Sequence, residues 1–347
     1  MKSNQLVAFG GVLAGIGVAL GAFAAHGLKK VLSPYLIDAS NLKNRYLTVL
    51  DSKDRMTTRP RMWRGIQATD GGHFILRGRE RDDFLKLEPD AKFLLKPYIG
   101  AAEFINNKSR WILDFRDVSP TDLRSMPEVQ KRISLVREFR SKSKKAGTRK
   151  LAGFPTQLEG TAYPSGAFLI VPRVSSERRL YHPIGYETPP TIPSDALIWG
   201  ENATLADFSI VVSTSHMAWL RCFGGRLKSD YRYSVGVVYN TFPWPDLTDA
   251  AKDKLTMTGQ AILDARAEWP EASLADLYDP DTMPANLRKA HQANDRTVDR
   301  LYRKAPFESE RERVEHLFML YEQLQSPILA AAKPKPRRRK ARTIKTS

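Results

Sequence analysis

Short apolar segments separated by turn residues fill positions 156–245, and this pattern limits the fold more than any other feature of the chain. The segments 167–174, 208–214 and 234–240 are rich in β-branched residues and are bounded by Gly, Pro or Ser, which is typical of strands. From about residue 248 onward, apolar residues instead recur every three or four positions, as on one face of a helix. We therefore predict an α+β fold, in which a mixed β-rich region with a long basic helix precedes a C-terminal helical region.

Three segments carry the helical spacing in the C-terminal region, namely 249–269, 282–302 and 309–324. One face of the third segment collects Val314, Leu317, Phe318, Tyr321 and Leu324. Nearer the N-terminus the pattern predicts shorter elements, which are a strand entered from a turn over 70–76, a helix over 79–87 and a strand over 110–115.

A long basic helix is predicted between Thr121 and Lys145. Ser119-Pro120 supplies an N-cap and a first-turn proline. One apolar stripe contains Leu123, Met126, Val129, Ile133, Val136 and Phe139. The C-terminal end is a dense basic cluster of Arg140, Lys142, Lys144, Lys145, Arg149 and Lys150. A solvated face and a favourable helix dipole explain part of this charge, and its density also favours contact with phosphates.

The chain carries a formal net charge of +17 and has an isoelectric point near 9.9. A charge of this size implies a polyanionic partner, either nucleic acid or an anionic membrane surface. Eight basic residues and no acid lie within 333–347, and we expect a disordered basic tail over 327–347. The only cysteine, Cys222, excludes an intramolecular disulfide and a multi-cysteine metal site, and its apolar neighbours predict that it is buried.

The N-terminal segment 1–32 differs from everything that follows it. Residues 6–25 are twenty uncharged positions, a length that just spans a hydrocarbon core, with small residues at four-residue spacing. The stretch 1–30 resembles the first transmembrane segment of a family of small uncharacterised membrane proteins. Because nothing similar to a membrane protein follows, we prefer a spliced or mis-started reading frame as the explanation. A genuine inner-membrane anchor is the alternative.

Two basic segments, 172–179 and 225–234, combine Arg, Ser and Tyr side chains in a way that suits a polyanion. Arginine forks pair with guanine edges and phosphates, hydroxyls bind phosphate oxygens, and aromatic faces stack on bases. We expect DNA contacts from these segments and from a neighbouring helical turn, namely from Arg173, Ser175, Ser176, Arg178, Arg179, Arg221, Arg226, Lys228, Ser229, Tyr231, Arg232 and Tyr233.

Structural explanations compete with some of these assignments. A local ion pair between Glu177 and Arg178 would tie a hairpin together without any DNA. Phosphates would repel Asp230, so we expect this carboxylate to orient Arg226 or Arg232. Trp219 is expected to lie in the core.

Several long and unusual phrases occur here in the order in which one protein family has them. They include DGGHFIL, IGAAEFINNKSRW, FLIVPRVSSERR, HMAWLRCFGGRLKSDYRYS, VVYNTFPWP and RVEHLFMLYEQL. Over about residues 33–325 the chain resembles the target-recognition and C-terminal region of the MmeI-like adenine-specific DNA methyltransferases, many of which are fused restriction–modification enzymes. The resemblance implies a DNA target-recognition domain at 33–245 and a helical domain at 246–326 that clasps the DNA from the other side.

The same family carries an S-adenosylmethionine-dependent methyltransferase domain, and this sequence shows none of its motifs. The family's Asn-Pro-Pro-Tyr or Asn-Pro-Pro-Phe turn is absent, since the single Pro-Pro pair, Pro189-Pro190, follows Thr188. A glycine-rich loop with an acidic partner, a Gly-x-Ser-x-Gly turn and metal-ligand spacing among the six histidines are absent too. We therefore predict no catalytic, cofactor-binding or metal-binding residue in this chain, and expect S-adenosylmethionine to bind a catalytic domain outside it.

The favoured hypothesis is sequence-specific recognition of double-stranded DNA by the target-recognition part of an N6-adenine methyltransferase, located in the cytoplasm with the nucleoid. Catalysis would then require a separate methyltransferase subunit. The alternative is a membrane-anchored basic protein that binds anionic lipid, or nucleic acid without sequence preference. That alternative gives the Tyr- and Ser-rich middle of the chain no role.

Overall fold

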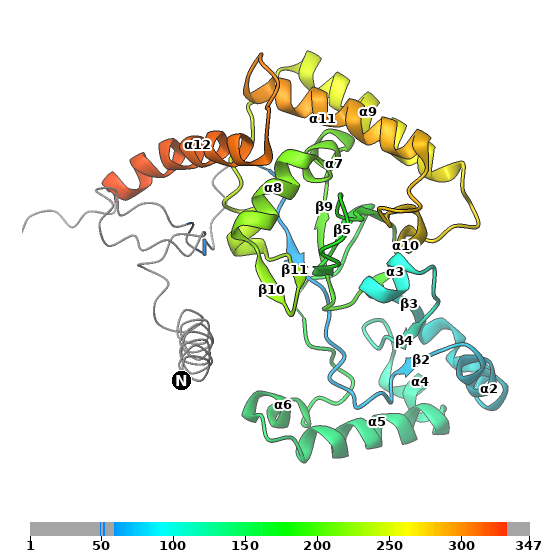
Figure 1. Ribbon diagram of the computed structural model, residues 1–347. Coiled ribbons are helices and arrows are strands. Elements are labelled where there is room, and N and C mark those ends of the chain that lie inside the picture. The colour runs from blue at the N-terminus through cyan, green and yellow to red at the C-terminus, as the bar shows by residue number, and fades with distance from the viewer. Residues whose placement is uncertain (1–48, 50, 53–58, 161, 332–347) are drawn as a thin grey trace, which may run out of the picture.

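The computed structural model describes residues 49, 51–52, 59–160 and 162–331. The N-terminal segment 1–32, with the membrane span considered over 6–25, lies outside these residues, as does the basic stretch 332–347. Among the residues that are described, no helix is both long and apolar enough to cross a membrane. The described part contains several small sheets and a C-terminal region of helices (Figure 1), which confirms the predicted α+β class.

Four antiparallel strands form the central sheet, in the spatial order β1 (Trp63–Arg64), β9 (Leu197–Glu201), β5 (Phe168–Pro172) and β7 (Gly185–Glu187). Strands β5 and β9 pair along the whole of β5, from Phe168 opposite Glu201 to Pro172 opposite Leu197. Every residue of β5 is buried, because the sheet is covered on both faces. The strand therefore reads as an uninterrupted apolar run rather than an alternating one.

A second sheet gathers around the N-terminal half of the described chain, in the order β2 (Ile75–Leu76), β4 (Trp111–Leu113), β3 (Leu95–Ile99) and β8 (Ile192–Pro193). It is accompanied by α2 (Arg79–Leu87), the 3-10 helix η1 (Pro89–Leu94), the short α3 (Ala101–Ile105) and α5 (Pro127–Ser141). A separate buried cluster that includes Phe74, Ile112 and Val136 forms its core. The strands and the helix predicted within 70–115 are confirmed.

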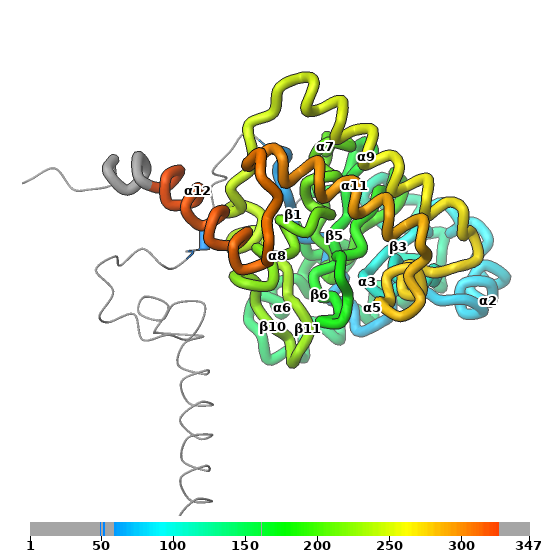
Figure 2. Tube along the Cα trace, turned by 45° about the horizontal axis from the view of Figure 1, so that its top comes forward, coloured from blue at the N-terminus to red at the C-terminus, as the bar shows by residue number. Residues whose placement is uncertain are grey.

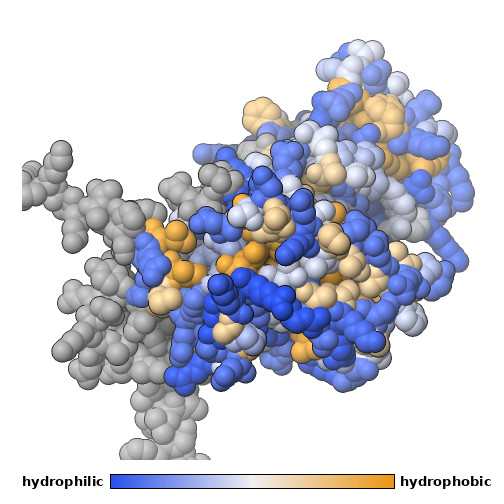
Figure 3. Space-filling model, turned by 90° about the horizontal axis from the view of Figure 1, so that it is seen from above, coloured by the Kyte–Doolittle hydropathy of each residue, from blue (hydrophilic) through white to orange (hydrophobic). Residues whose placement is uncertain are grey.

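Helices dominate the rest of the chain, namely α7 (Leu205–Val211), α8 (Thr214–Phe223), α9 (Asp249–Ala267), α10 (Leu274–Leu277), α11 (Ala285–Tyr302) and α12 (Glu310–Ala331). In Figure 1, α9 and α11 lie together above α7, and α12 extends to one side next to α8. Their buried residues join those of β5 and β9 in one core that includes Trp219, Leu255 and Leu317. Seen from the side of α9 and α11 in Figure 3, hydrophilic residues cover most of the surface. The three predicted C-terminal helices are confirmed.

Two of the three segments predicted as strands are helical instead. Residues 208–214 lie in α7 and at the start of α8, and 234–240 contain a π-helical turn, η2 (Val235–Tyr239). Thr204 and Asp207 form a capping box at the start of α7, and every residue of α7 after Leu205 is buried. A short segment that is buried on all sides has no polar face, so its sequence cannot distinguish a helix from a strand.

The single helix predicted over 121–145 is divided into α4 (Pro120–Arg124) and α5, which ends at Ser141, and the short α6 (Ala146–Leu151) follows. Ser119 caps α4 as predicted, since its side chain accepts a hydrogen bond from the N–H of Asp122 (3.0 Å). The first break falls at Met126, because the ring of Pro127 disfavours helical backbone in the residue before it.

The first part of the expected tail is helical. Helix α12 continues to Ala331, so the stretch that was predicted to be disordered from residue 327 is helical as far as residue 331. Its sequence after Pro327 consists of Ile, Leu and Ala, of which Leu and Ala are strong helix formers. The basic run further along the chain had obscured this signal.

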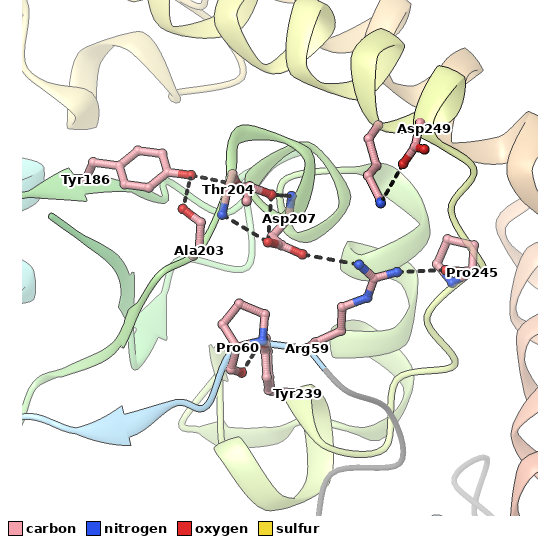
Figure 4. A network of polar contacts seen from close by, with 10 residues as sticks. Arg59, Pro60, Tyr186, Ala203, Thr204, Asp207, Tyr239, Pro245 and Asp249 are labelled. Carbon is pink, nitrogen blue, oxygen red and sulfur yellow. Dashed lines mark hydrogen bonds and ion pairs between the residues drawn. The ribbon is translucent and has the colours of Figure 1, made fainter.

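Arg59 and Pro60, which precede β1, are tied to the far end of the β-rich region. The guanidinium of Arg59 lies 3.6 Å from the carboxylate of Asp207 and donates to the carbonyl of Pro245 (3.0 Å). The hydroxyl of Tyr239 donates to the carbonyl of Pro60 (2.8 Å). Figure 4 shows that these contacts converge near the start of α7. The entry and the exit of the β-rich region therefore close around one core.

Candidate nucleic-acid interface

The second predicted segment, 225–234, forms a β-hairpin. Its strands β10 (Gly225–Leu227) and β11 (Asp230–Arg232) pair antiparallel, and Lys228, which has a left-handed backbone (φ 56°), forms the turn with Ser229. Strand β11 also pairs with β6 (Val174–Ser175), which belongs to the first predicted segment. One three-stranded sheet thus brings the two segments together.

The register of the hairpin gives it two different faces. Directly opposed residues in an antiparallel pair point to the same side: Arg226 opposes Tyr231, Leu227 opposes Asp230 and Gly225 opposes Arg232. Tyr231 is 8% exposed and belongs to the main core, so its side of the hairpin is the inner face. Leu227, Asp230 and Arg232 consequently lie on the outer face.

Arg226 is held on the inner face. Its guanidinium lies 3.9 Å from the centre of the Tyr231 ring and donates to the carbonyl of Ser229 (2.9 Å). The expectation that Asp230 orients Arg226 or Arg232 is therefore wrong, because Arg226 binds the backbone of the turn and Asp230 forms no ion pair in the described part of the chain. This stacked arginine fixes the turn from the side of the core.

The outer face and the turn present charged groups that are not held by short polar contacts. Within the described ranges, the side chains of Lys228, Asp230 and Arg232 make neither an ion pair nor a hydrogen bond. Lys228 and Arg232 are exposed, and Leu227 beside them is 52% exposed. The hairpin therefore offers two cations, one acceptor and one apolar side chain to a ligand.

Positive charge continues from the hairpin onto the central sheet. Arg173 donates to the carbonyl of Asp195 (2.8 Å), and the carboxylate of Asp195 forms an ion pair with Arg64 (2.7 Å). Burial lowers the pKa of Arg173, and the nearby charges of Arg64 and Arg232 lower it further. Three guanidinium groups from distant parts of the sequence thus share one electropositive region. Arg64 was missed by the sequence prediction, because it stands alone in a segment without a motif.

The other predicted residues of the first segment are largely engaged by protein groups. Ser175 is buried, and its hydroxyl accepts from Arg179 (3.4 Å), so it cannot reach DNA in this conformation, contrary to the prediction. Burial lowers the pKa of Arg179. The hydroxyl of half-buried Ser176 accepts from the backbone N–H of Arg178 (3.3 Å). The Arg178 guanidinium pairs with Asp281 of the C-terminal region (2.5 Å) rather than with Glu177.

Tyr233 is also a wrong prediction, because it is fully buried. Its hydroxyl is hydrogen-bonded to Nε2 of His216 (2.8 Å). Arg221 is mainly structural, since it pairs with Glu310 (2.5 Å) and donates to the carbonyl of Leu180 (3.1 Å). These contacts join α8, a loop and α12.

Two neighbours of Arg221 in α8 were assigned to the core, with different outcomes. Trp219 is fully buried, as predicted. Cys222 is half-buried, so the expectation of a buried cysteine was wrong. The apolar run around it did not reveal that the end of α8 lies close to the surface.

Helices α5 and α6 form an arm that carries the remaining predicted contacts. Its exposed basic side chains include those of Lys144 and Lys145, in the link between the two helices, and of Arg149 and Lys150 in α6. Arg149 also donates to the carbonyls of Ser143 (2.9 Å) and Lys144 (2.8 Å), which orders the link between the two helices. Figures 1 and 2 show α6 on the same side of the molecule as the hairpin β10–β11.

Arg140, which the sequence placed in the same phosphate-binding cluster, has a different role. It is completely buried and donates to five backbone carbonyls, those of Ala68, Thr69, Leu151, Phe154 and Gln157. Its neighbour Phe139, predicted on the apolar stripe, is instead 43% exposed and lies against Gly71. The rotation of α5 about its own axis thus buries the charged Arg140 and exposes the aromatic Phe139.

The turn at Gly100 does not fit a binding site for S-adenosylmethionine. A cavity of about 410 Å³ borders the strand–glycine–helix turn at Gly100, but α3 beyond it has only five residues. The acid in the turn, Glu103, is occupied by Arg110 (2.9 Å) and by the N–H of Gly100 (3.0 Å), so it is not free for a ribose. Among all the residues that the structure describes, no group of three or more His, Cys, Asp or Glu could hold a metal ion.

Comparisons with known proteins agree with this architecture. The family model of the MmeI target recognition domain matches residues 43–246, and that of the MmeI C-terminal domain matches residues 247–329. DNA methyltransferase A of Bacillus subtilis (strain 168) is 36% identical over 294 residues, which are 84% of this chain and 33% of that protein. The solved structure of the Type IIL restriction-modification enzyme MmeI in complex with DNA is 37% identical, with a TM-score of 0.80.

The chain spans only part of these relatives, since the match to the MmeI structure covers 85% of this chain and 39% of that one. Its β-rich region and its C-terminal helices both have counterparts in the family models. The chain belongs to the MmeI family, of which it contains the target recognition and C-terminal domains.

Proposed function

We propose that this chain recognises a short asymmetric sequence in double-stranded DNA, as the target-reading part of an MmeI-like restriction–modification protein. The observation that carries the proposal is the outer face of the hairpin. There, Lys228, Asp230 and Arg232 form no hydrogen bond or ion pair through their side chains within the described residues, whereas Arg178 and Arg221 are held by acids of the C-terminal region. Charged side chains left free at a protein surface are available to a ligand.

The shape and chemistry of the hairpin suit the major groove of DNA, which admits a two-stranded β-ribbon. Arg232 supplies the fork that pairs with O6 and N7 of guanine, and Asp230 supplies an acceptor for a base amino group. Lys228 at the turn supplies a donor for a guanine edge or a phosphate. The set distinguishes base pairs, because it combines donor and acceptor groups at fixed positions of one strand pair.

Contacts with phosphates are assigned to the arm. Lys144, Lys145 and Lys150 are exposed, and α6, which contains Lys150, lies on the side of the molecule that also carries the hairpin. A net charge of +17 supports strong attraction to a polyanion. Phosphate contacts orient the protein along the duplex and base contacts select the sequence, so the arm and the hairpin have complementary tasks.

We assign methyl transfer to a region of the family outside the part matched here. The relatives named as DNA methyltransferase A and as MmeI are about three times and two and a half times as long as the part matched here, given the 33% and 39% coverage. We assign S-adenosylmethionine binding and catalysis to a methyltransferase region carried by another part of a longer protein or by a separate subunit. We further propose that the chain works in the cytoplasm, on the DNA of its own cell.

Selection from random DNA duplexes tests the proposal. The full chain is incubated with the duplex pool at near-physiological salt and with excess competitor DNA, because the basic tail alone would bind any polyanion. Enrichment of a short asymmetric motif is the expected result. Binding without enrichment would overturn specific recognition and leave only nonspecific electrostatic attraction.

A further inference from the structure

We propose that Leu227 is a further specificity-determining residue, which contacts the 5-methyl group of a pyrimidine in the major groove. The inference rests on the proposed function, since it assigns one more base-reading group to the same hairpin. The ligand is a 5-methylpyrimidine, either thymine or 5-methylcytosine. Both bases carry the methyl group at the same position of the major-groove edge.

Leu227 does not contribute to the core. It is 52% exposed, and it lies on the outer face opposite Asp230, away from the buried ring of Tyr231. Its partner positions in the sheet therefore give it a direction, outward from the protein. An exposed leucine gains nothing in folding, so its side chain is free to be covered by a ligand.

Within the outer face, Leu227 lies next to the turn of the hairpin. A Cβ atom added to Gly225 would meet Cβ of Arg232 at 3.7 Å and its Cδ at 3.9 Å, so the stem of Arg232 lies over Gly225 at the base of the hairpin. Leu227 lies one pair nearer the turn, beside Lys228. It is the apolar side chain nearest the tip of a ribbon whose other free groups are charged.

The outer face of the hairpin complements the groups that bases present in the major groove. The major groove presents donors, acceptors and one apolar group, which is the pyrimidine methyl. Asp230 can accept a hydrogen bond from a base donor, and Arg232 can donate to base acceptors. Leu227 is the residue on the same face that can make an apolar contact with the methyl group. A leucine that faces a base without this methyl would lose the apolar contact and gain no hydrogen bond.

The experiment uses the full chain and the duplex that selection enriches. Each thymine of that duplex is replaced in turn by deoxyuridine, which removes only the methyl group, and each cytosine by 5-methylcytosine, which adds it. Dissociation constants are measured by fluorescence anisotropy for the wild type, Leu227→Ala and Leu227→Asn, which keeps the branched arrangement of side-chain heavy atoms but is polar. Leu87→Ala is the matched control, because Leu87 is an exposed leucine (71%) on α2, away from the hairpin in Figures 1 and 2.

We expect one position at which the methyl group strengthens wild-type binding about fourfold, the factor that burial of one methyl group gives. Sensitivity to deoxyuridine would identify thymine as the ligand, and a gain with 5-methylcytosine would identify that base. Both Leu227 variants should lose the difference, and Leu87→Ala should keep it.

Two outcomes would overturn the inference while recognition itself stands. In the first, the wild type responds to no methyl substitution in the enriched site. In the second, Leu227→Ala responds as strongly as the wild type. Failure to enrich any sequence is a different result, because it would overturn the proposed function and this inference with it.

Discussion

The guanidinium of Arg226 lies 3.9 Å from the centre of the Tyr231 ring, and this contact separates the arginines of one hairpin into two roles. Tyr231 belongs to the main core, so Arg226 is drawn to the inner face and braces the turn. Arg232 lies opposite Gly225, so its side chain points to the outer face. Within the described residues it forms no hydrogen bond or ion pair there. Two arginines in a ten-residue segment therefore have different surroundings, one stacked against the core and one directed to the solvent.

Replacement of Arg232 by alanine should relax specificity at one base pair. A bidentate arginine–guanine contact contributes about 1–3 kcal/mol of discrimination against the wrong base, which is a factor between about 5 and about 150. The measurement compares dissociation constants for the enriched duplex and for every single base-pair change in it. Lys254→Ala, at an exposed lysine of α9, should leave the whole profile unchanged. A uniform loss across all sequences in Arg232→Ala would instead assign Arg232 to a phosphate.

The ion pair between Arg178 and Asp281 should restrain nonspecific binding. Both side chains are largely exposed, and such pairs contribute only about 0–1 kcal/mol to stability, so Asp281→Asn should unfold at nearly the wild-type temperature. The freed Arg178 should raise affinity for a random duplex at low salt by about two- to fivefold. Asp249→Asn breaks an exposed ion pair with Lys252 on α9 and serves as the control. Unchanged or weaker binding by Asp281→Asn would contradict this account.

Arg140 should matter for folding and not for DNA. Its side chain is fully buried among five carbonyl acceptors, and replacement by methionine leaves all of them without their donor. We expect a loss of about 3 kcal/mol in the free energy of unfolding, measured by urea denaturation. Arg137→Met, three residues earlier at an exposed position, should change stability by less than about 0.5 kcal/mol. Equal effects of the two variants would contradict the assigned role.

Stability should fall below neutral pH because of buried histidines. Burial lowers the pKa of His182 from 6.5 to about 4 and that of His216 from 6.5 to about 3. The unfolded chain binds protons at these side chains from pH 6.5 downward and the folded chain does not, so their contribution is complete above pH 6.5 and is lost as the pH falls. At about pH 5 the loss should be on the order of 2 kcal/mol for each histidine.

A variant isolates this effect from that of Asp295. Burial raises the pKa of Asp295 to about 6, so its contribution to stability is present at low pH and is lost as the pH rises through about 6, the opposite sense. His182→Gln keeps a side-chain donor near the carbonyl of Pro172, which lies 2.7 Å from Nε2 of His182, but does not titrate. Its unfolding free energy should fall by about 2 kcal/mol less than that of the wild type between about pH 7.5 and pH 5. Parallel curves for the two proteins would contradict the explanation.

The elements that sequence reasoning predicted well are those with a local physical signal. The C-terminal helices have a polar side and an apolar side, so their spacing is visible in the sequence. Ser119 with Pro120 marks a helix start through chemistry that needs only neighbouring residues. The short α7 has no polar side, and its capping residues Thr204 and Asp207 gave the only local sign of a helix.

The segments predicted to contact DNA come together in one small sheet, but the sequence did not show which of their side chains face the solvent. Whether a basic or aromatic side chain faces the solvent depends on strand register, which a list of residue types does not contain. The alternation of Tyr231, Arg232 and Tyr233 was the available signal, since it places both tyrosines on one face and the arginine on the other. Nothing local could have shown that Arg140 is buried, because its five acceptors come from segments up to 72 residues away.

The most direct test of the central claim compares two selections from the same random duplex pool. One uses the wild-type chain, and the other uses a variant with Lys228→Ala, Asp230→Asn and Arg232→Ala, which removes the free charges of the hairpin without touching the core. The account predicts an asymmetric motif for the wild type, and for the variant continued binding through the arm with no preference at those base pairs. Enrichment of the same motif by both proteins would contradict the claim that the outer face of the hairpin reads DNA.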